Sequence, residues 1–238
     1  MITTMKKIFF IALFSLCMAS ATNAQGKYKK PQDMTTVQEE KPRRGLFDKD
    51  KTPIDKKYLE GACPMVGNKI VWQKYFYADD KTAKEIYDIM LKFLQKMTKE
   101  EGQTKKSDVA AVNEEEYQIG ARFVEKMVFQ NSALSLDQAV FSYQLLVYCI
   151  DGRCEVVMKN MNYIYEADRD GGGQFPAEDM LADDIALNKK KDGFHIGGYK
   201  KFRMKTIDRK DEIFTKISRA LKQSGNGNGQ NNDTSTWE

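Results

Sequence analysis

The sequence predicts an α+β protein in which an antiparallel sheet of about five strands carries helices on one face. Three observations indicate this class. Segments rich in aromatic and β-branched residues fill the middle of the chain. On each side of them lies a segment in which apolar residues recur at helical spacing. An Asp-Gly pair marks a tight hairpin. Such a sheet buries its apolar face beneath the helices.

The first strand and the first helix follow each other directly. Residues 70–78 (IVWQKYFYA) are aromatic and β-branched, which predicts a strand. Residues 79–102 predict a helix, for which Thr82 and Glu85 offer a capping box, although Asp79 or Asp80 could cap it instead. The apolar residues at helical spacing are Ile86, Met90, Phe93, Leu94 and Met97.

Four further strands are expected to form two hairpins. Residues 107–112 and 117–129 alternate between apolar and polar side chains around an acidic turn. Residues 141–150 and 153–167 surround Asp151-Gly152, a strong signal for a two-residue turn. The pairs that this turn predicts are Ile150 with Arg153, Cys149 with Cys154, Val147 with Val156, and Leu145 with Met158. One face of this hairpin is then almost wholly apolar and should lie beneath a helix.

The C-terminal part predicts one clear helix, at residues 208–223. Asp208 is a candidate N-cap, and Gly225 lies beyond the helix end. The apolar side of this helix consists of Ile213, Ile217, Ala220 and Leu221. The preceding residues 166–203 contain a glycine triplet and a candidate short helix at 176–187, and they allow no other assignment.

Three segments carry a resemblance to a known family. They are KIVWQKYFYADDKTAKEIYDIMLKFLQK, AVNEEEYQIGARF and YQLLVYCIDGRCEVVMKNMNYIYEA, and they span residues 69–167. In these segments the chain resembles small exported proteins, chiefly of Bacteroidota, that are grouped as a domain of unknown function with a TATA-binding-protein-like fold. The resemblance implies the fold and export, but it assigns no role to any residue. The cysteine pair and the long insertion before the last helix depart from the family pattern.

Residues 1–24 have the composition of a secretory signal peptide. Two lysines precede an apolar run at residues 8–19, and small residues precede Gln25. The run is shorter than the ~20 residues that span a membrane. We therefore expect cleavage before Gln25 and a mature chain, without a transmembrane span, in the periplasm or cell envelope or outside the cell. Lipidation at Cys17 is the alternative, but a leucine precedes this cysteine where a small residue is expected.

The predicted domain comprises residues 58–223. The two segments beside it are expected to be disordered. Residues 25–57 combine prolines with alternating charges, and residues 224–238 are of low complexity. Without the signal peptide the chain has 36 Lys and Arg against 34 Asp and Glu, because two of the 38 basic residues are removed. This balance argues against nucleic acid as a partner. We expect an unidentified protein or envelope component instead.

Cys149 and Cys154 are predicted to form a disulfide. They face each other at a non-hydrogen-bonded pair, where the strands are close enough for a bridge, and export favours oxidation. Two buried free thiols are the alternative. Cys63 is the odd cysteine, which could compete for either partner or stay free.

No catalytic or metal-binding motif stands out. The chain has one histidine, His195, and its cysteines have no zinc-site spacing. We therefore predict no metal, no cofactor and a non-catalytic binding or accessory module. A hydrolase with His195 as its base is one alternative, and a structural envelope protein without a specific ligand is the other.

The second face of the sheet is the candidate binding surface. Its predicted residues are Arg122, Tyr148, Lys159, Met161 and Tyr163. Aromatic, Met and Arg side chains are enriched at protein interfaces. The alternative is that the C-terminal segment covers this face.

Overall fold

A computed structural model describes residues 53–132, 135–167, 172–195 and 199–223. The predicted signal peptide, almost all of the predicted linker and the C-terminal tail lie outside the described residues. The elements are η2 (Lys56–Tyr58), β1 (Met65–Val66), β2 (Lys69–Ile70), β3 (Trp72–Tyr77), α2 (Ala83–Met97), β4 (Asp108–Asn113), β5 (Gln118–Ser132), β6 (Ser135–Ile150), β7 (Arg153–Tyr165), β8 (Gly173–Pro176), α3 (Glu178–Leu181), α4 (Asp183–Ala186) and α5 (Tyr199–Gln223).

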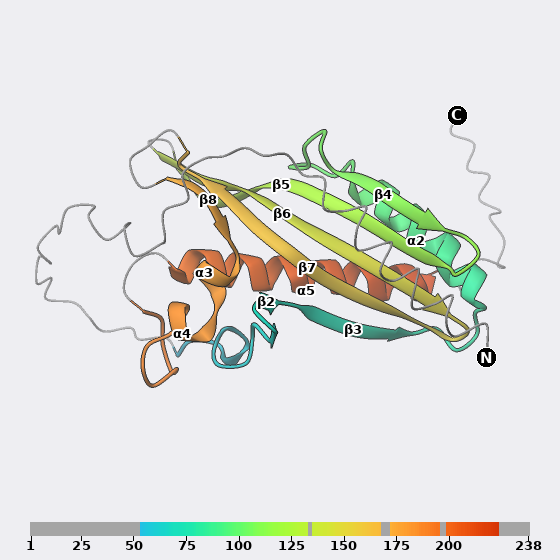
Figure 1. Cartoon of the computed structure of the whole chain (residues 1–238), viewed down its shortest axis with the longest axis horizontal. Coiled ribbons are helices and arrows are strands. Elements are labelled where there is room, and N and C mark those ends of the chain that lie inside the picture. Colours follow the sequence, from blue (N-terminus) through green and yellow to red (C-terminus); the bar gives the residue numbers. More distant parts are fainter. Residues whose placement is uncertain (1–52, 133–134, 168–171, 196–198, 224–238) are drawn as a thin grey trace, which may run out of the picture.

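A six-stranded antiparallel sheet forms one layer, with strand order β3-β7-β6-β5-β4 and β8 paired to β7 (Figure 1). The sequence predicted about five strands. The sixth, β8, is short and lies in the segment that allowed no assignment. One edge of β7 pairs with β6. Along the other edge, β3 pairs with residues 153–158 of β7, and β8 pairs with residues 162–165.

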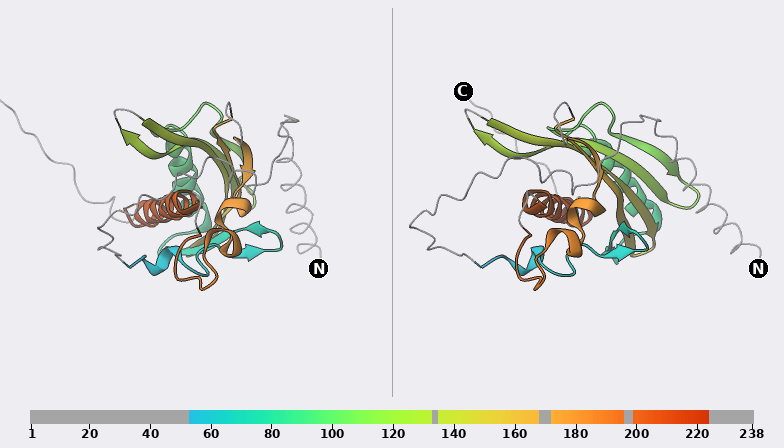
Figure 2. Two further views of the ribbon diagram at one scale, coloured as in Figure 1. Left: turned by 90° about the vertical axis from the view of Figure 1, so that its left-hand side faces the viewer. Right: turned by 60° about the vertical axis from the view of Figure 1, so that its left-hand side comes forward.

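The two long helices, α2 and α5, pack on the same face of the sheet (Figure 2). Helix α2 begins with the predicted capping box, in which the Glu85 N–H donates to Thr82 Oγ1 at 3.3 Å and the Glu85 carboxylate accepts from the Thr82 N–H at 2.8 Å. None of the helices in the described ranges is long and apolar enough to cross a membrane.

Helix α5 starts at Tyr199, earlier than the predicted start at residue 208. Asp208 therefore lies inside the helix and does not cap it. Its carboxylate accepts hydrogen bonds from Lys57 Nζ and Tyr58 Oη, both at 2.7 Å. Lys57 was predicted to belong to the linker, so the folded unit begins before residue 58.

Strands β6 and β7 pair in the predicted register around Asp151-Gly152, including the pairs Cys149 with Cys154 and Val147 with Val156. The register then shifts, so that Asn160 and Met161 of β7 lie opposite a single residue, Tyr143 of β6. This is a β-bulge, and Asn160 has a left-handed backbone with φ of 53°.

Because of the bulge, the predicted positions of Met161 and Tyr163 were wrong. Before it, Cys154, Val156 and Met158 face the helices, and after it the alternate residues Met161 and Tyr163 do. Strict alternation along the strand placed Met161 and Tyr163 on the open face. The extra residue in the bulge reverses the alternation, and both side chains are fully buried in the core.

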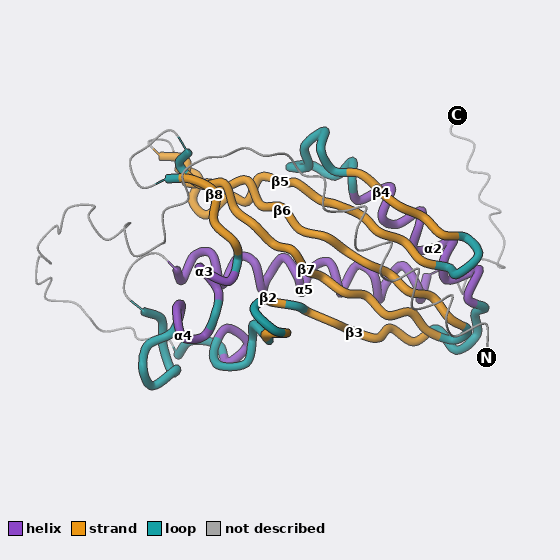
Figure 3. Tube along the Cα trace, viewed as in Figure 1, coloured by secondary structure: helices purple, strands orange, loops and turns teal. Residues whose placement is uncertain are grey.

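Aromatic rings fill the core beneath the long strands. The Phe141 ring stacks on the Tyr163 ring at a centroid distance of 5.0 Å, and Phe123 stacks on Tyr143 at 5.2 Å. Phe202 of α5 meets the edge of Tyr163 at 5.0 Å. These contacts join the sheet to the N-terminal half of α5, which runs beneath the strands (Figure 3).

Candidate functional site

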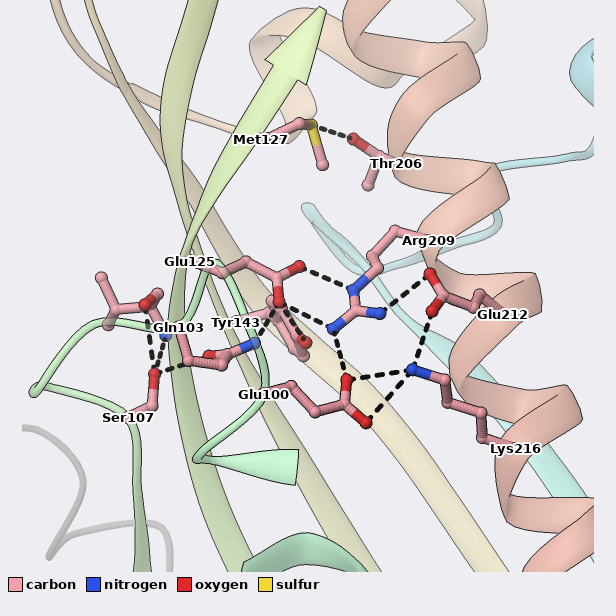
Figure 4. A network of polar contacts seen from close by, with 11 residues as sticks. Glu100, Gln103, Ser107, Glu125, Met127, Tyr143, Thr206, Arg209, Glu212 and Lys216 are labelled. Atoms are coloured by element: carbon pink, nitrogen blue, oxygen red, sulfur yellow. Dashed lines mark hydrogen bonds and ion pairs between the residues drawn. The ribbon is translucent and has the colours of Figure 1, made fainter. Parts of the chain in front are cut away.

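A cleft of about 580 Å³ lies between β5, the connection from α2 to β4, and α5. At its base, the buried Glu125 carboxylate accepts two hydrogen bonds from Arg209, from Nε and Nη2, both at 2.8 Å (Figure 4). Gln103 Nε2 and Tyr143 Oη also donate to Glu125. These four hydrogen-bond donors offset the free-energy cost of burying the Glu125 carboxylate.

The same network continues along α5. Arg209 Nη1 lies 2.9 Å from Glu212, and Lys216 Nζ lies 2.8 Å from Glu212 and 3.0 Å from Glu100 (Figure 4). Burial alone would lower the pKa of Arg209, but its hydrogen bond to Glu125 and the surrounding negative charge raise this pKa above its ordinary value. Burial first, and then the Glu125 charge, raise the pKa of Tyr143.

These contacts make the network a poor place for acid–base chemistry. Arg209 stays protonated and Tyr143 stays neutral, because both pKa values rise. Arg209 donates to both oxygens of Glu125 and so holds this carboxylate in one orientation. The network joins β5 to α5 and to the residues after α2. It therefore stabilises the packing of α5 on the sheet.

The face of the sheet opposite the helices carries tyrosines and arginines. Tyr75 and Tyr77 are 44% and 65% exposed, and the Arg153 guanidinium lies 5.5 Å from the centre of the Tyr75 ring. Gln73 Nε2 donates to the Glu155 carboxylate at 2.6 Å. The outer face, as we call it, consists of Gln73, Tyr75, Tyr77, Arg122, Tyr148, Arg153, Glu155 and Lys159.

Three of the five predicted face residues lie here. Tyr148 is paired with Glu155 in the sheet, and burial followed by the Glu155 charge raises the pKa of Tyr148. Arg122 Nη2 lies 3.3 Å from Asp108, and Lys159 is half-buried. The C-terminal helix α5 packs on the opposite face, so residues 199–223 do not cover this one.

Sequence reasoning missed Tyr75 and Tyr77, although a signal for them was present. In β3, Trp72 and Phe76 are buried, so the alternating positions 73, 75 and 77 must face outward. The same alternation that was applied to the central hairpin identifies both tyrosines.

Cys149 and Cys154 face each other across β6 and β7 but are free thiols in the structure. The predicted register is thus confirmed, whereas the disulfide is not formed and stays a prediction. Burial raises the pKa of Cys154 to about 12, and burial raises the pKa of Cys149 as well. Cys63 is a third buried thiol, and its pKa is raised by burial to about 12.

His195 has an exposed side chain in the irregular segment between α4 and α5, where its N–H donates to the Ala186 carbonyl at 2.9 Å. It does not line the cleft between β5 and α5. In the part of the chain that the structure describes, no three His, Cys, Asp or Glu side chains are arranged to hold a metal ion.

Arg203 is a structural residue that the sequence did not reveal. It is fully buried, and it donates to the carbonyls of Tyr58, Leu59 and Leu181 and to the Asp183 carboxylate. It therefore ties the start of the folded unit and the α3–α4 segment to α5. Its partners are remote in sequence, so no local pattern marks it.

A six-stranded antiparallel sheet with the two long helices α2 and α5 on a single face defines an α+β protein with a TBP-like fold. The family model described as "Domain of unknown function (DUF4468) with TBP-like fold" matches residues 72–164. The chain is similar to a DUF4468 family protein from Bacteroides ovatus ATCC 8483, with 33% identity and a TM-score of 0.65, over 70% of this chain and 94% of that chain. The chain therefore belongs to the DUF4468 family.

A second solved structure, a TBP-like protein from Parabacteroides distasonis ATCC 8503, shares the fold. It is 18% identical with a TM-score of 0.53, over 67% of this chain and 97% of that chain. No curated protein matches the chain.

Proposed function

We propose that the protein is exported and acts as a non-catalytic binding module of the cell envelope, with the outer face as its contact surface. The observation that carries this proposal is the exposure of Tyr75 and Tyr77 beside Arg153 on a sheet face that no described helix covers. Tyrosine and arginine are the residues that most often dominate binding energy at protein interfaces. The partner we expect is a protein of the envelope.

The hydrolase alternative has less support. A general base must reach the proton that it abstracts and needs a nucleophile or a bound water nearby. His195 is exposed and lies away from the cleft between β5 and α5, and the buried thiols have raised pKa values, which makes them poor nucleophiles.

Site-specific photo-crosslinking in the native organism tests the contact surface. A benzophenone amino acid is placed at position 75, 77 or 148, and at the exposed Gln95 of α2 as a matched control. We expect one discrete adduct from the outer face and none from position 95. The adduct should disappear in an Arg153→Glu variant that still folds. Equal adducts from both faces, or no adduct that saturates with expression level, would favour a structural protein without a specific ligand.

Export and the disulfide are tested on the same preparation. We expect mass spectrometry of the non-reduced envelope fraction to find a mature chain that begins at Gln25 and a Cys149–Cys154 linkage. A chain that retains residues 1–24 in the cytoplasm would contradict export. Free thiols at both positions in an exported chain would contradict the disulfide alone and leave the binding proposal intact.

A further inference from the structure

Strand β5 has one edge that is only partly paired. Strand β4 pairs with this edge as far as Arg122, and the connection before β4 extends the cover to Lys126, whose N–H donates to the Gly102 carbonyl at 2.9 Å. Along residues 127–131, no residue that the structure describes pairs with this edge. An unpaired edge presents backbone donors and acceptors that an added strand satisfies.

An apolar cleft of about 370 Å³ lies beside this open edge. Its lining consists of Phe129, Lys200, Lys201, Met204, Lys205 and Asp208. It shares Lys205 and Asp208 with the larger cleft, which residues 125–128 of β5 line. The two clefts therefore follow the same stretch of β5 and α5, one after the other. Side chains of a strand added to β5 would point alternately toward this groove and away from it.

The lysines beside the groove favour an acidic occupant, because in the described part of the chain the carboxylates that line the larger cleft are, apart from Glu101, already paired. Within the described ranges, Lys126, Lys200 and Lys205 have no carboxylate at ion-pair distance. The acid in the lining of the apolar cleft, Asp208, is already paired with Lys57 at 2.7 Å. Unpaired lysines around an apolar groove attract carboxylates at the rim and apolar side chains within it.

We propose that an extended acidic segment of a partner protein adds as a strand to β5 along residues 127–131, with its apolar side chains against Phe129 and Met204 and its carboxylates near Lys126, Lys200 and Lys205. This site is distinct from the outer face. It rests on an unpaired strand edge, and the outer-face proposal rests on exposed side chains, so the two are tested separately.

The test uses the full mature chain and fluorescein-labelled synthetic peptides in anisotropy titrations. The peptide EVELEVE alternates acidic and apolar residues, KVKLKVK reverses its charge, and EVEPEVE interrupts strand pairing with proline. We expect saturable binding of EVELEVE, with affinity at least about tenfold higher than that of the other two. A Lys200→Glu/Lys205→Glu variant should lose about tenfold in affinity. Lys92→Glu/Lys96→Glu on the exposed side of α2 makes the same charge change and should have little effect.

Hydrogen exchange locates the site without a mutation. Bound EVELEVE should slow exchange of backbone amides within residues 127–131, and a Tyr77→Ala variant of the outer face should bind the peptide normally. Lysines on a strand edge also serve to prevent unspecific pairing. If that is their role here, no peptide binds saturably, and the proposal is overturned. Equal affinity for EVELEVE and KVKLKVK, or protection confined to other strands, overturns it as well.

Discussion

Arg203 shows at the residue scale how one buried charge holds three segments together. Its guanidinium donates to the Tyr58 carbonyl at 2.7 Å and to the Asp183 carboxylate at 2.6 Å, and Asp183 also accepts from the Gly61 N–H at 2.7 Å. Removing one partner of such a cluster leaves the other groups buried and unpaired.

We therefore expect Arg203→Met to lower the free energy of unfolding by about 3 kcal/mol or more. Arg219→Met, on the exposed side of the same helix, is the matched control and should change stability by less than about 0.5 kcal/mol. Urea denaturation followed by circular dichroism measures both. Equal stability of the two variants would show that the Arg203 contacts contribute little.

Glu212 gives the network beside the cleft a predictable pH dependence. Burial would raise the pKa of Glu212, but hydrogen bonds from Lys216 and Arg209 outweigh it and lower this pKa below 4.5. A lowered pKa stabilises the folded state fully above about pH 4.5, and this stabilisation disappears as the pH falls through the lower folded-state value. In a Glu212→Gln variant, the free energy of unfolding should therefore fall less steeply as the pH is lowered below about 4.5. Glu115→Gln, on the exposed β4–β5 turn, should leave this slope unchanged.

Within strand β7, the bulge determines which side chains face the core. Asn160 occupies the left-handed region, which a β-branched residue adopts only with strain. Its side chain also donates to Gln144 at 2.7 Å. We expect Asn160→Val to cost about 1–2 kcal/mol in thermal or urea unfolding. Lys159→Val on the same strand, with ordinary backbone geometry, should be close to neutral. Similar losses in both variants would mean that the bulge tolerates other conformations.

The elements also show which features a sequence can predict. The capping box of α2 and the Asp151-Gly152 hairpin depend on residues that are near each other in the chain, so local spacing was sufficient. The bulge at Asn160 depends on how β7 meets β6, and its effect on Met161 and Tyr163 could not be predicted from alternation alone. The early start of α5 was missed because lysines at 200, 201 and 205 mask the apolar positions Phe202 and Ile207.

At the scale of the whole molecule, one core joins all layers. Its buried residues run from Tyr58 in η2 to Leu221 at the end of α5. Residues 53–223 alone should therefore unfold in one cooperative transition, and we expect the same midpoint in urea as for a chain of residues 25–238. A midpoint lower by more than the experimental error would show that residues outside this range contribute to stability.

The edge of β7 also bears on how the chain acquires its structure. Strand β3 precedes the central hairpin and β8 follows it, yet both complete the same edge, and Arg203 joins residues that lie 145 positions apart. Contacts of such long sequence separation slow folding, because loop closure must precede them. The last helix must be available before the core closes, so a growing chain stays incompletely folded until α5 has been synthesised. For a protein that we propose is exported, this delay lengthens the period in which the chain can be threaded across a membrane.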